Sequence, residues 1–201
     1  MYLDKRVKKF YSYFMTISKL TLADLARSGH VTRWHSVRTS RDQTLAEHHY
    51  MVTRISNRLA KDIFGSDLDD SGLLRIMEYA SLHDTPELLM GDLPSPLKRH
   101  IEQIGGADNP IEAIEAEIAP WLIDMKNEIR QQHPEHLVVI KLADLIDAIL
   151  FIEHEGISKH AKAVAKGLKE QLQAKVEGAG RRYSGYSWDI AAKRGTRGYC
   201  V

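Results

Sequence analysis

The chain has one cysteine, no long apolar run and almost no net charge, and each of these absences excludes a class of protein. Cys200 stands alone, so an internal disulfide framework is impossible and a reducing compartment is expected. No stretch of about 18 apolar residues occurs, which argues against a membrane span. The N-terminus is charged and aromatic and lacks an apolar signal core. These features predict a cytoplasmic protein with no membrane partner.

The charge balance also limits the kind of partner. The chain carries 28 Lys and Arg against 27 Asp and Glu, for a net charge of +1. Because binding to nucleic acid relies on an excess of cations that meet phosphates, nucleic acid is not expected as the obligatory partner of the whole fold. A length of 201 residues suits one domain. No alternating strand pattern is present, so we expect an all-α protein.

Helical periodicity runs through most of the chain and predicts a single compact bundle of about seven or eight helices. A capping box, Thr44-Leu-Ala-Glu47, opens one of these helices, and Thr85 followed by Pro86 is typical of another helix start. Residues 178–201 are rich in Gly, Arg and Tyr without periodicity, so we expect the domain to end at residue 177 and the tail to be partly disordered or packed on a partner subunit. The expected helices cover about residues 5–26, 44–64, 73–83, 97–104, 110–130 with a break at Pro120, 134–155 and 158–177.

The stretch SLHDTPELLMGDLPSPLK, residues 81–98, concentrates chemically active side chains at a junction of two helices. His83 and Asp84 are adjacent, and Glu87 and Asp92 follow within ten residues. Apolar neighbours such as Leu88 indicate that the segment packs inward. Buried carboxylates need a cation or a proton, so this stretch favours a metal site.

Asp144 is another carboxylate expected to be buried, because it lies in the apolar run VVIKLADLIDAILF. A lone carboxylate there is costly unless it is paired. Lys141 and Asp147 each lie three residues away on the same helix face and are alternative partners. A metal shared with His48 and with the His-Asp pair at 83–84 would satisfy Asp144 equally well. Two imidazoles and two carboxylates suit a divalent ion such as Mn²⁺, Co²⁺, Fe²⁺ or Zn²⁺, with Mg²⁺ a further candidate.

The order of these residues, His48, then His83-Asp84, then Asp144, resembles the H…HD…D pattern of the HD-domain metal-dependent phosphohydrolases. The runs RWHSVRT…TLAEH, LHDTPELLMGDLPSPLK and IKLAD are similar to the branch that contains bacterial 5′-deoxynucleotidases and phage deoxynucleoside triphosphate triphosphohydrolases. The similarity covers about residues 33–150. It implies an HD-domain helical bundle that hydrolyses the 5′-phosphate ester of a deoxynucleotide, in a host cytoplasm if a phage encodes it.

The resemblance also implies roles for individual residues. His48, His83, Asp84 and Asp144 would hold one catalytic metal ion, which activates a water molecule and polarises a phosphoryl oxygen. Glu87 would be the catalytic acid or base. Its alternative role is structural, because a carboxylate in the first turn of a helix favours the positive end of the helix dipole.

Five further residues would bind the substrate. Arg33, Lys98 and Lys141 match the cations that contact phosphate, and Asp92 matches the carboxylate that accepts a hydrogen bond from the 3′-hydroxyl. Trp34 would line the sugar pocket and exclude a 2′-hydroxyl, although a tryptophan by default packs in the hydrophobic core. Monophosphate and triphosphate substrates both remain open.

Other functions remain possible at this stage. One is an HD enzyme that acts on a cyclic nucleotide or an alarmone. Another is a non-catalytic, metal-stabilised module that binds nucleic acid through the tail. Its cations would be Arg181, Arg182, Lys193, Arg194 and Arg197, and its stacking residues Tyr183, Tyr186 and Trp188. We also expect a homo-oligomer.

Overall fold

The computed structural model describes residues 20–106 and 109–196. Within them lie two short 3₁₀ helices, two isolated β-bridges and no β-strand, so the prediction of an all-α protein is confirmed. Eight of the α-helices have eight residues or more, as expected, and α2 and α5 have four each. The elements are α2 (Leu22–Leu25), η1 (Ser28–His30), α3 (Leu45–Phe64), η2 (Gly65–Asp67), α4 (Asp70–Leu82), α5 (Glu87–Met90), α6 (Ser95–Gly105), α7 (Pro110–Ile118), α8 (Pro120–Gln132), α9 (Pro134–Glu155), α10 (Lys159–Arg182) and α11 (Asp189–Thr196).

Local sequence signals set most of the helix ends. The side chain of Thr44 accepts a hydrogen bond from the backbone of Glu47, and the Glu47 carboxylate accepts one from the backbone of Thr44, which completes the expected capping box of α3. Asn109 caps α7 through its side chain, and prolines open α7, α8 and α9. At each of these helix starts, either a side chain accepts a hydrogen bond from a backbone N–H that has no partner within the helix, or a proline stands there and has no N–H that needs a partner.

One expected cap is wrong. Pro86, rather than Thr85, precedes the first residue of α5, and no side chain caps that helix. The backbone amide of Thr85 instead bonds to the carbonyl of Leu82 in a turn, and its hydroxyl is buried without a hydrogen-bond partner among the described residues. The junction between α4 and α5 is thus a continuous run of tight turns, which leaves Thr85 without the extended backbone that a capping residue needs.

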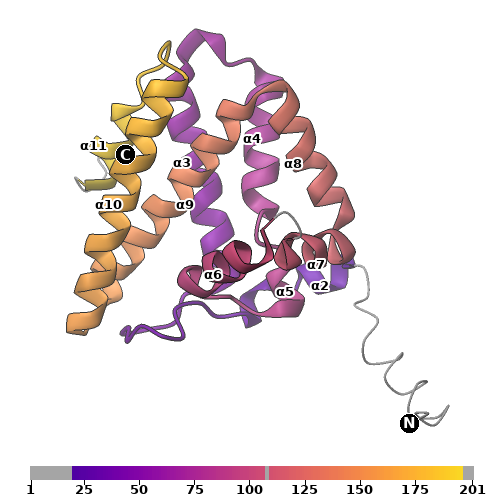
Figure 1. Ribbon diagram of the computed structural model, residues 1–201, viewed down its shortest axis with the longest axis vertical. Helices are drawn as coiled ribbons and strands as arrows, with labels where there is room; N and C mark the ends of the chain where they lie inside the picture. The colour runs from indigo at the N-terminus through magenta and orange to yellow at the C-terminus, as the bar shows by residue number, and fades with distance from the viewer. Residues whose placement is uncertain (1–19, 107–108, 197–201) are drawn as a thin grey trace, which may run out of the picture.

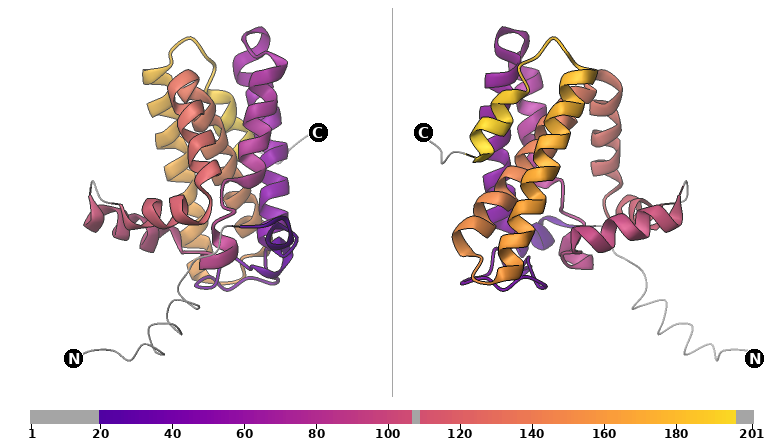
Figure 2. Two further views of the ribbon diagram at one scale, coloured as in Figure 1. Left: turned by 90° about the vertical axis from the view of Figure 1, so that its right-hand side faces the viewer. Right: turned by 60° about the vertical axis from the view of Figure 1, so that its left-hand side comes forward.

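The core lies where α9 packs between its neighbours. Helix α9 contacts α3 on one side and α10 on the other, and α3 also packs along α4. Figures 1 and 2 show these long helices forming the bundle, while α6 and α7 run across one end of it. The same end holds α5 and the irregular segment 31–44 that precedes α3. No helix in the described part of the chain is long and apolar enough to cross a membrane.

The C-terminal expectation is wrong over the described residues. The expected boundary after residue 177 lies inside α10, which continues to Arg182. Trp188 is 2% exposed, donates its indole N–H to the carbonyl of Tyr183 and meets Phe64 edge-on. Helix α11 then packs on α3, α9 and α10. Aromatic burial therefore joins this segment to the bundle of its own chain, and residues 197–201 lie outside the described range.

The N-terminal helix expected over residues 5–26 lies mostly outside the described residues. In the described part, α2 is a single turn opened by a capping box between Thr21 and Asp24.

Candidate metal centre

Two segments far apart in the sequence bring two histidines and an aspartate into mutual contact. His48 lies in the first turns of α3, whereas His83 ends α4 and Asp84 follows it. The Nε2 atoms of His48 and His83 are 3.3 Å apart, and Asp84 Oδ2 lies 3.4 Å from each. Two atoms bound to one ion at 2.0–2.1 Å in tetrahedral geometry are about 3.3 Å apart. The three atoms therefore have the spacing of ligands on one divalent ion.

Asp144 completes what we call the metal-facing cluster: His48, His83, Asp84 and Asp144. Its Oδ1 atom lies 3.7 Å from His48 Nε2, and one ligand atom each from the two histidines and Asp144 fall within 4.8 Å of one another. Its Oδ2 atom accepts a hydrogen bond of 2.5 Å from Lys141 Nζ. Burial by itself would raise the pKa of Asp144, but the charge of Lys141 holds it below the ordinary value. Asp144 thus faces the cluster as an anion, and Lys141 is its partner along the helix.

The other ring nitrogen of each histidine is occupied. His83 Nδ1 lies 2.9 Å from the carbonyl oxygen of Ala80, to which it donates. His48 Nδ1 lies 2.7 Å from Asp147 Oδ2. These contacts leave both Nε2 atoms free to act as ligands, and a second hydrogen-bonded shell of this kind is usual around metal-bound histidines. The donor set and its support fit a divalent ion.

Sequence reasoning missed two residues behind His48. Asp147 was considered there only as an alternative to Lys141 beside Asp144, and Gln43 carried no signal. Gln43 donates from Nε2 to Asp147 Oδ2 at 2.9 Å and accepts from Trp34 Nε1 at 2.8 Å. The signal for Asp147 was its position, one helical turn after Asp144 on an otherwise apolar helix.

Arg33 joins the cluster to the sequence element that contains Asp92. Its Nη1 atom lies 3.2 Å from Asp84 Oδ2, and its Nε atom lies 3.9 Å from Asp92 Oδ1. All three side chains are largely buried. Burial favours the neutral form of Asp84, but the interactions with His83, the hydrogen bond to His48 and the charge of Arg33 hold its pKa well below the ordinary value. The site thus combines fixed anions with a buried guanidinium.

Glu87 is the acid of the site that lacks a partner. It is 4% exposed, and its Oε2 atom is buried with no hydrogen-bond partner among the described residues. Burial and the negative charge of Asp84 raise its pKa to about 9. Glu87 therefore carries a proton near neutral pH, unlike the carboxylates around it. A buried, protonated acid beside a charged cluster is suited to proton transfer.

Lys98 and Trp34 lie at the edges of this arrangement. Lys98 Nζ pairs with Glu115 Oε1 of α7 at 3.1 Å, rather than with a residue of the metal-facing cluster. Trp34 has a φ of 70°, in the left-handed region that disfavours side chains with a β-carbon, and its ring stacks on Phe151 at 6.1 Å between centroids. The hydrogen bond to Gln43 links Trp34 to the metal-facing cluster.

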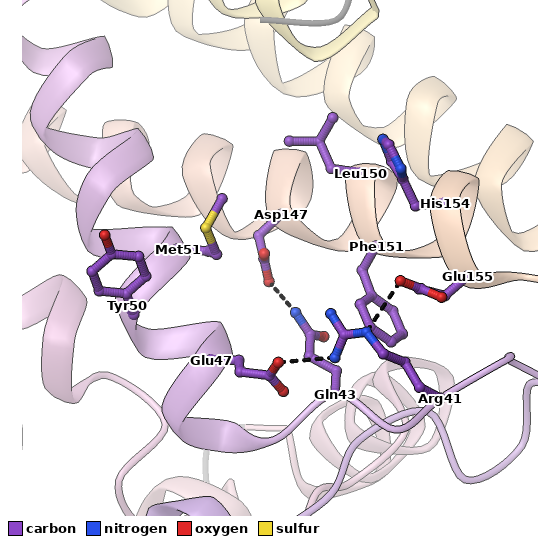
Figure 3. Close-up of a pocket in the computed structure, with 10 residues that line it drawn as sticks. All are labelled: Arg41, Gln43, Glu47, Tyr50, Met51, Asp147, Leu150, Phe151, His154 and Glu155. Atoms are coloured by element: carbon purple, nitrogen blue, oxygen red, sulfur yellow. Dashed lines mark hydrogen bonds and ion pairs between the residues drawn. The ribbon is translucent and has the colours of Figure 1, made fainter. Parts of the chain in front are cut away.

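A cavity of about 400 Å³ lies behind His48, between α3 and α9. Figure 3 shows Asp147 and Gln43 on its wall, and Arg41 held between Glu47 and Glu155. None of the site residues expected from the sequence lines this cavity. It is separate from the side of His48 on which Nε2 meets the other ligands.

Comparison with known proteins identifies the family of this chain. The family model described as 5′-deoxynucleotidase YfbR-like matches residues 13–178. A dATP triphosphohydrolase of Acinetobacter phage SH-Ab 15497 is 28% identical over 185 residues, which cover 87% of this chain and 89% of that protein. The 5′-deoxynucleotidase YfbR of Salmonella arizonae is 34% identical over 158 residues, which cover 76% and 72%.

A solved structure shares the fold. The HD phosphohydrolase DatZ of cyanophage S-2L, bound to dA and one catalytic Zn²⁺ ion, aligns with a TM-score of 0.70 and 23% identity over 89% of this chain and 93% of that one. The match of the family model spans most of the 201 residues, and it includes every member of the metal-facing cluster. The chain therefore belongs to the YfbR-like family of 5′-deoxynucleotidases.

Proposed function

We propose that this protein hydrolyses the 5′-phosphate ester of a deoxyribonucleotide and releases a deoxynucleoside with phosphate or triphosphate. The observation that carries the proposal is the convergence of the metal-facing cluster from three segments of the chain: atoms of His48, His83 and Asp84 lie 3.3–3.4 Å apart, and Asp144 lies 3.7 Å from His48. The relatives support it, because they are named dATP triphosphohydrolases and 5′-deoxynucleotidases.

His48, His83, Asp84 and Asp144 would hold the ion in this proposal. Two imidazoles and two carboxylates suit Mn²⁺, Co²⁺, Zn²⁺ or Fe²⁺ better than Mg²⁺, which prefers oxygen ligands. The zinc ion named with DatZ supports a first-row metal. A divalent ion bound here would supply Lewis acidity to a phosphoryl oxygen and lower the pKa of a water molecule.

Glu87 is the proposed proton-transfer residue. Its carboxyl holds a proton because burial and Asp84 raise its pKa to about 9. When the bond between phosphorus and the 5′-oxygen breaks, that oxygen needs a proton, and Glu87 can donate it. The resulting carboxylate recovers a proton from the water that adds to phosphorus.

The remaining residues would hold the substrate. Arg33 faces the cluster, and Lys141 contacts Asp144, so both can meet a phosphoryl group at the ion. Lys98 would reach it after leaving Glu115. Within the described residues the ion pair of Asp92 is with Arg33 at 3.9 Å, so its carboxylate can accept a hydrogen bond from the 3′-hydroxyl. Trp34 would close the sugar pocket against a 2′-hydroxyl.

A nucleic-acid-binding role for the tail has less support. Trp188, one of the three aromatic residues considered for base stacking, is buried in the core. We further propose that the protein acts in the cytoplasm as a homo-oligomer. Leu74 is 66% exposed on α4 and Trp121 is 38% exposed on α8, which gives an apolar surface for self-association. Light scattering coupled to size-exclusion chromatography measures the oligomeric state.

The central experiment is a substrate panel. The protein is dialysed against EDTA, then incubated with each dNMP, NMP, dNTP and NTP and with Mn²⁺, Co²⁺, Zn²⁺ or Mg²⁺, and the products are separated by ion-exchange chromatography. We expect metal-dependent release of a deoxynucleoside, with phosphate or triphosphate as the second product. The absence of deoxynucleoside with every metal, or full turnover in excess EDTA, would overturn the proposal.

A further inference from the structure

A chain of hydrogen bonds connects Trp34 to His48 through the interior. The indole Nε1 of Trp34 donates to Gln43 Oε1 at 2.8 Å, and Gln43 Nε2 donates to Asp147 Oδ2 at 2.9 Å. The same carboxylate oxygen lies 2.7 Å from His48 Nδ1. Figure 3 shows the central link, with the amide of Gln43 directed at Asp147. The side chains of Trp34, Gln43 and Asp147 thus form a continuous hydrogen-bonded path that ends at Nδ1 of His48.

The donor and acceptor roles along this hydrogen-bonded path fix the orientation of each group. An indole N–H only donates, so the oxygen of the Gln43 amide must face Trp34 and its NH₂ group must face Asp147. Asp147 Oδ2, which already accepts from Gln43, accepts the Nδ1–H of His48 as well, so a neutral His48 presents an unprotonated Nε2 to the cluster. Gln43 is 2% exposed and Asp147 3% exposed, so the bond between them is buried. The network therefore selects the tautomer of His48 that can bind a metal.

The backbone of segment 31–44 places the side chain of Gln43 between Trp34 and Asp147. The amide of Arg33 bonds to the carbonyl of Gln43 at 2.9 Å, and Thr32 forms a β-bridge with Thr44, so segment 31–44 closes on itself. Trp34 adopts its left-handed backbone conformation within that loop. Because such a conformation is unfavourable for a residue with a β-carbon, it persists only where side-chain contacts hold it. The bond to Gln43 and the stacking on Phe151 are those contacts.

We propose that Asp147 and Gln43 are positioning residues, and that Gln43 couples the residue that selects the sugar, Trp34, to the metal ligand His48. The inference rests on the proposed function for the role of Trp34, whereas the role of Asp147 depends only on metal binding. Loss of Asp147 should weaken metal binding, and loss of Gln43 should weaken metal binding and sugar selection together.

Two measurements separate these roles. The first is the Mn²⁺ dissociation constant of the dialysed protein, followed by electron paramagnetic resonance without any substrate. The second is the ratio of kcat/KM for a deoxynucleotide to that for the matching ribonucleotide. Thermal unfolding of each metal-free variant shows whether it is folded. The control is Gln173→Met, because Gln173 on α10 also donates to a carboxylate, Glu177, at 2.9 Å but is exposed and belongs to another helix face.

We expect Asp147→Ala to weaken Mn²⁺ binding by about 10–100-fold, the usual cost of losing such a supporting group. Asp147→Asn keeps an oxygen that accepts from both His48 and Gln43, so it should recover most of that loss and also remain folded. Trp34→Phe should lower the deoxy-to-ribo ratio and leave Mn²⁺ binding unchanged. Gln43→Met should change both quantities, and Gln173→Met neither.

Several results would overturn the inference. Equal Mn²⁺ affinity in Asp147→Ala and the wild type would remove the positioning role of Asp147. A Gln43→Met protein that matches Gln173→Met, or that changes only one of the two quantities, would remove the coupling. Wild-type protein that binds Mn²⁺ but hydrolyses no deoxynucleotide would instead contradict the proposed function, and the Mn²⁺ measurement would still decide the role of Asp147.

Discussion

Two groups of histidine and carboxylate side chains lie along α9, and only one of them has the support that a metal site needs. The metal-facing cluster uses the middle of the helix, at Asp144. The second cluster consists of His133, Glu135 and His136, at the start of the helix, and its ligand atoms also fall within 4.8 Å of one another. His136 and Asp144 are eight residues apart, or about 12 Å along the helix axis.

The second cluster differs in how its groups are held. His136 Nδ1 is buried with no hydrogen-bond partner among the described residues, and its ring stacks on that of His133 at 4.8 Å between centroids. It also packs on Phe64, where it acts as an apolar ring. All three residues come from one short stretch of chain, whereas the metal-facing cluster draws on three segments and has an acceptor for each second ring nitrogen. Donor count alone does not identify a metal site; the orientation of the donors does.

Metal stoichiometry tests this comparison most strongly. We expect dialysed wild-type protein to take up one equivalent of Mn²⁺ per chain and Asp84→Ala to take up none, with turnover at background. The matched change in the second cluster, Glu135→Gln, should leave uptake and turnover unchanged. Atomic absorption after gel filtration gives the stoichiometry. A second equivalent that disappears in Glu135→Gln would show that both clusters bind metal.

A variant of Glu87 tests proton transfer separately from metal binding at the metal-facing cluster. Glu87→Gln keeps the shape of the side chain but removes the proton that it would donate, so we expect full metal content and a loss of at least about a hundredfold in turnover. Glu78→Gln, an exposed change on α4, is the control. Turnover of Glu87→Gln within the range of that control would leave Glu87 as a structural residue.

The smallest expected effect is a pH dependence of stability from the second cluster. Burial lowers the pKa of His136 to about 4 from an ordinary value of 6.5. Because the folded state prefers neutral His136, this contribution is fully present above pH 6.5 and is lost as the pH falls from 6.5 to 4. Urea unfolding across this range should show a steeper loss in the wild type than in His136→Gln, and parallel curves would contradict it.

Local signals in the sequence predicted the helices well. The capping box at Thr44 and the prolines at 110, 120 and 134 act through backbone groups within one turn, so their effect does not depend on the rest of the fold. Thr85 failed as a cap because its backbone amide bonds to the carbonyl of Leu82 in the continuous turn between α4 and α5. The tail boundary failed because the partner of Trp188 is Phe64, more than a hundred residues away in the chain.

By itself, the sequence determined the helical class of this protein, most helix starts and the family to which it belongs, since each depends on local periodicity or on an ordered set of motifs. Only the tertiary structure decided which atoms meet. It turned Asp147 toward His48 and left Asp144 paired with Lys141, aligned Gln43 between Trp34 and the carboxylate of Asp147, and buried Glu87 beside Asp84. Hydrogen-bond direction and pKa depend on distances between segments 35 to about 100 residues apart, and chain order does not encode those distances.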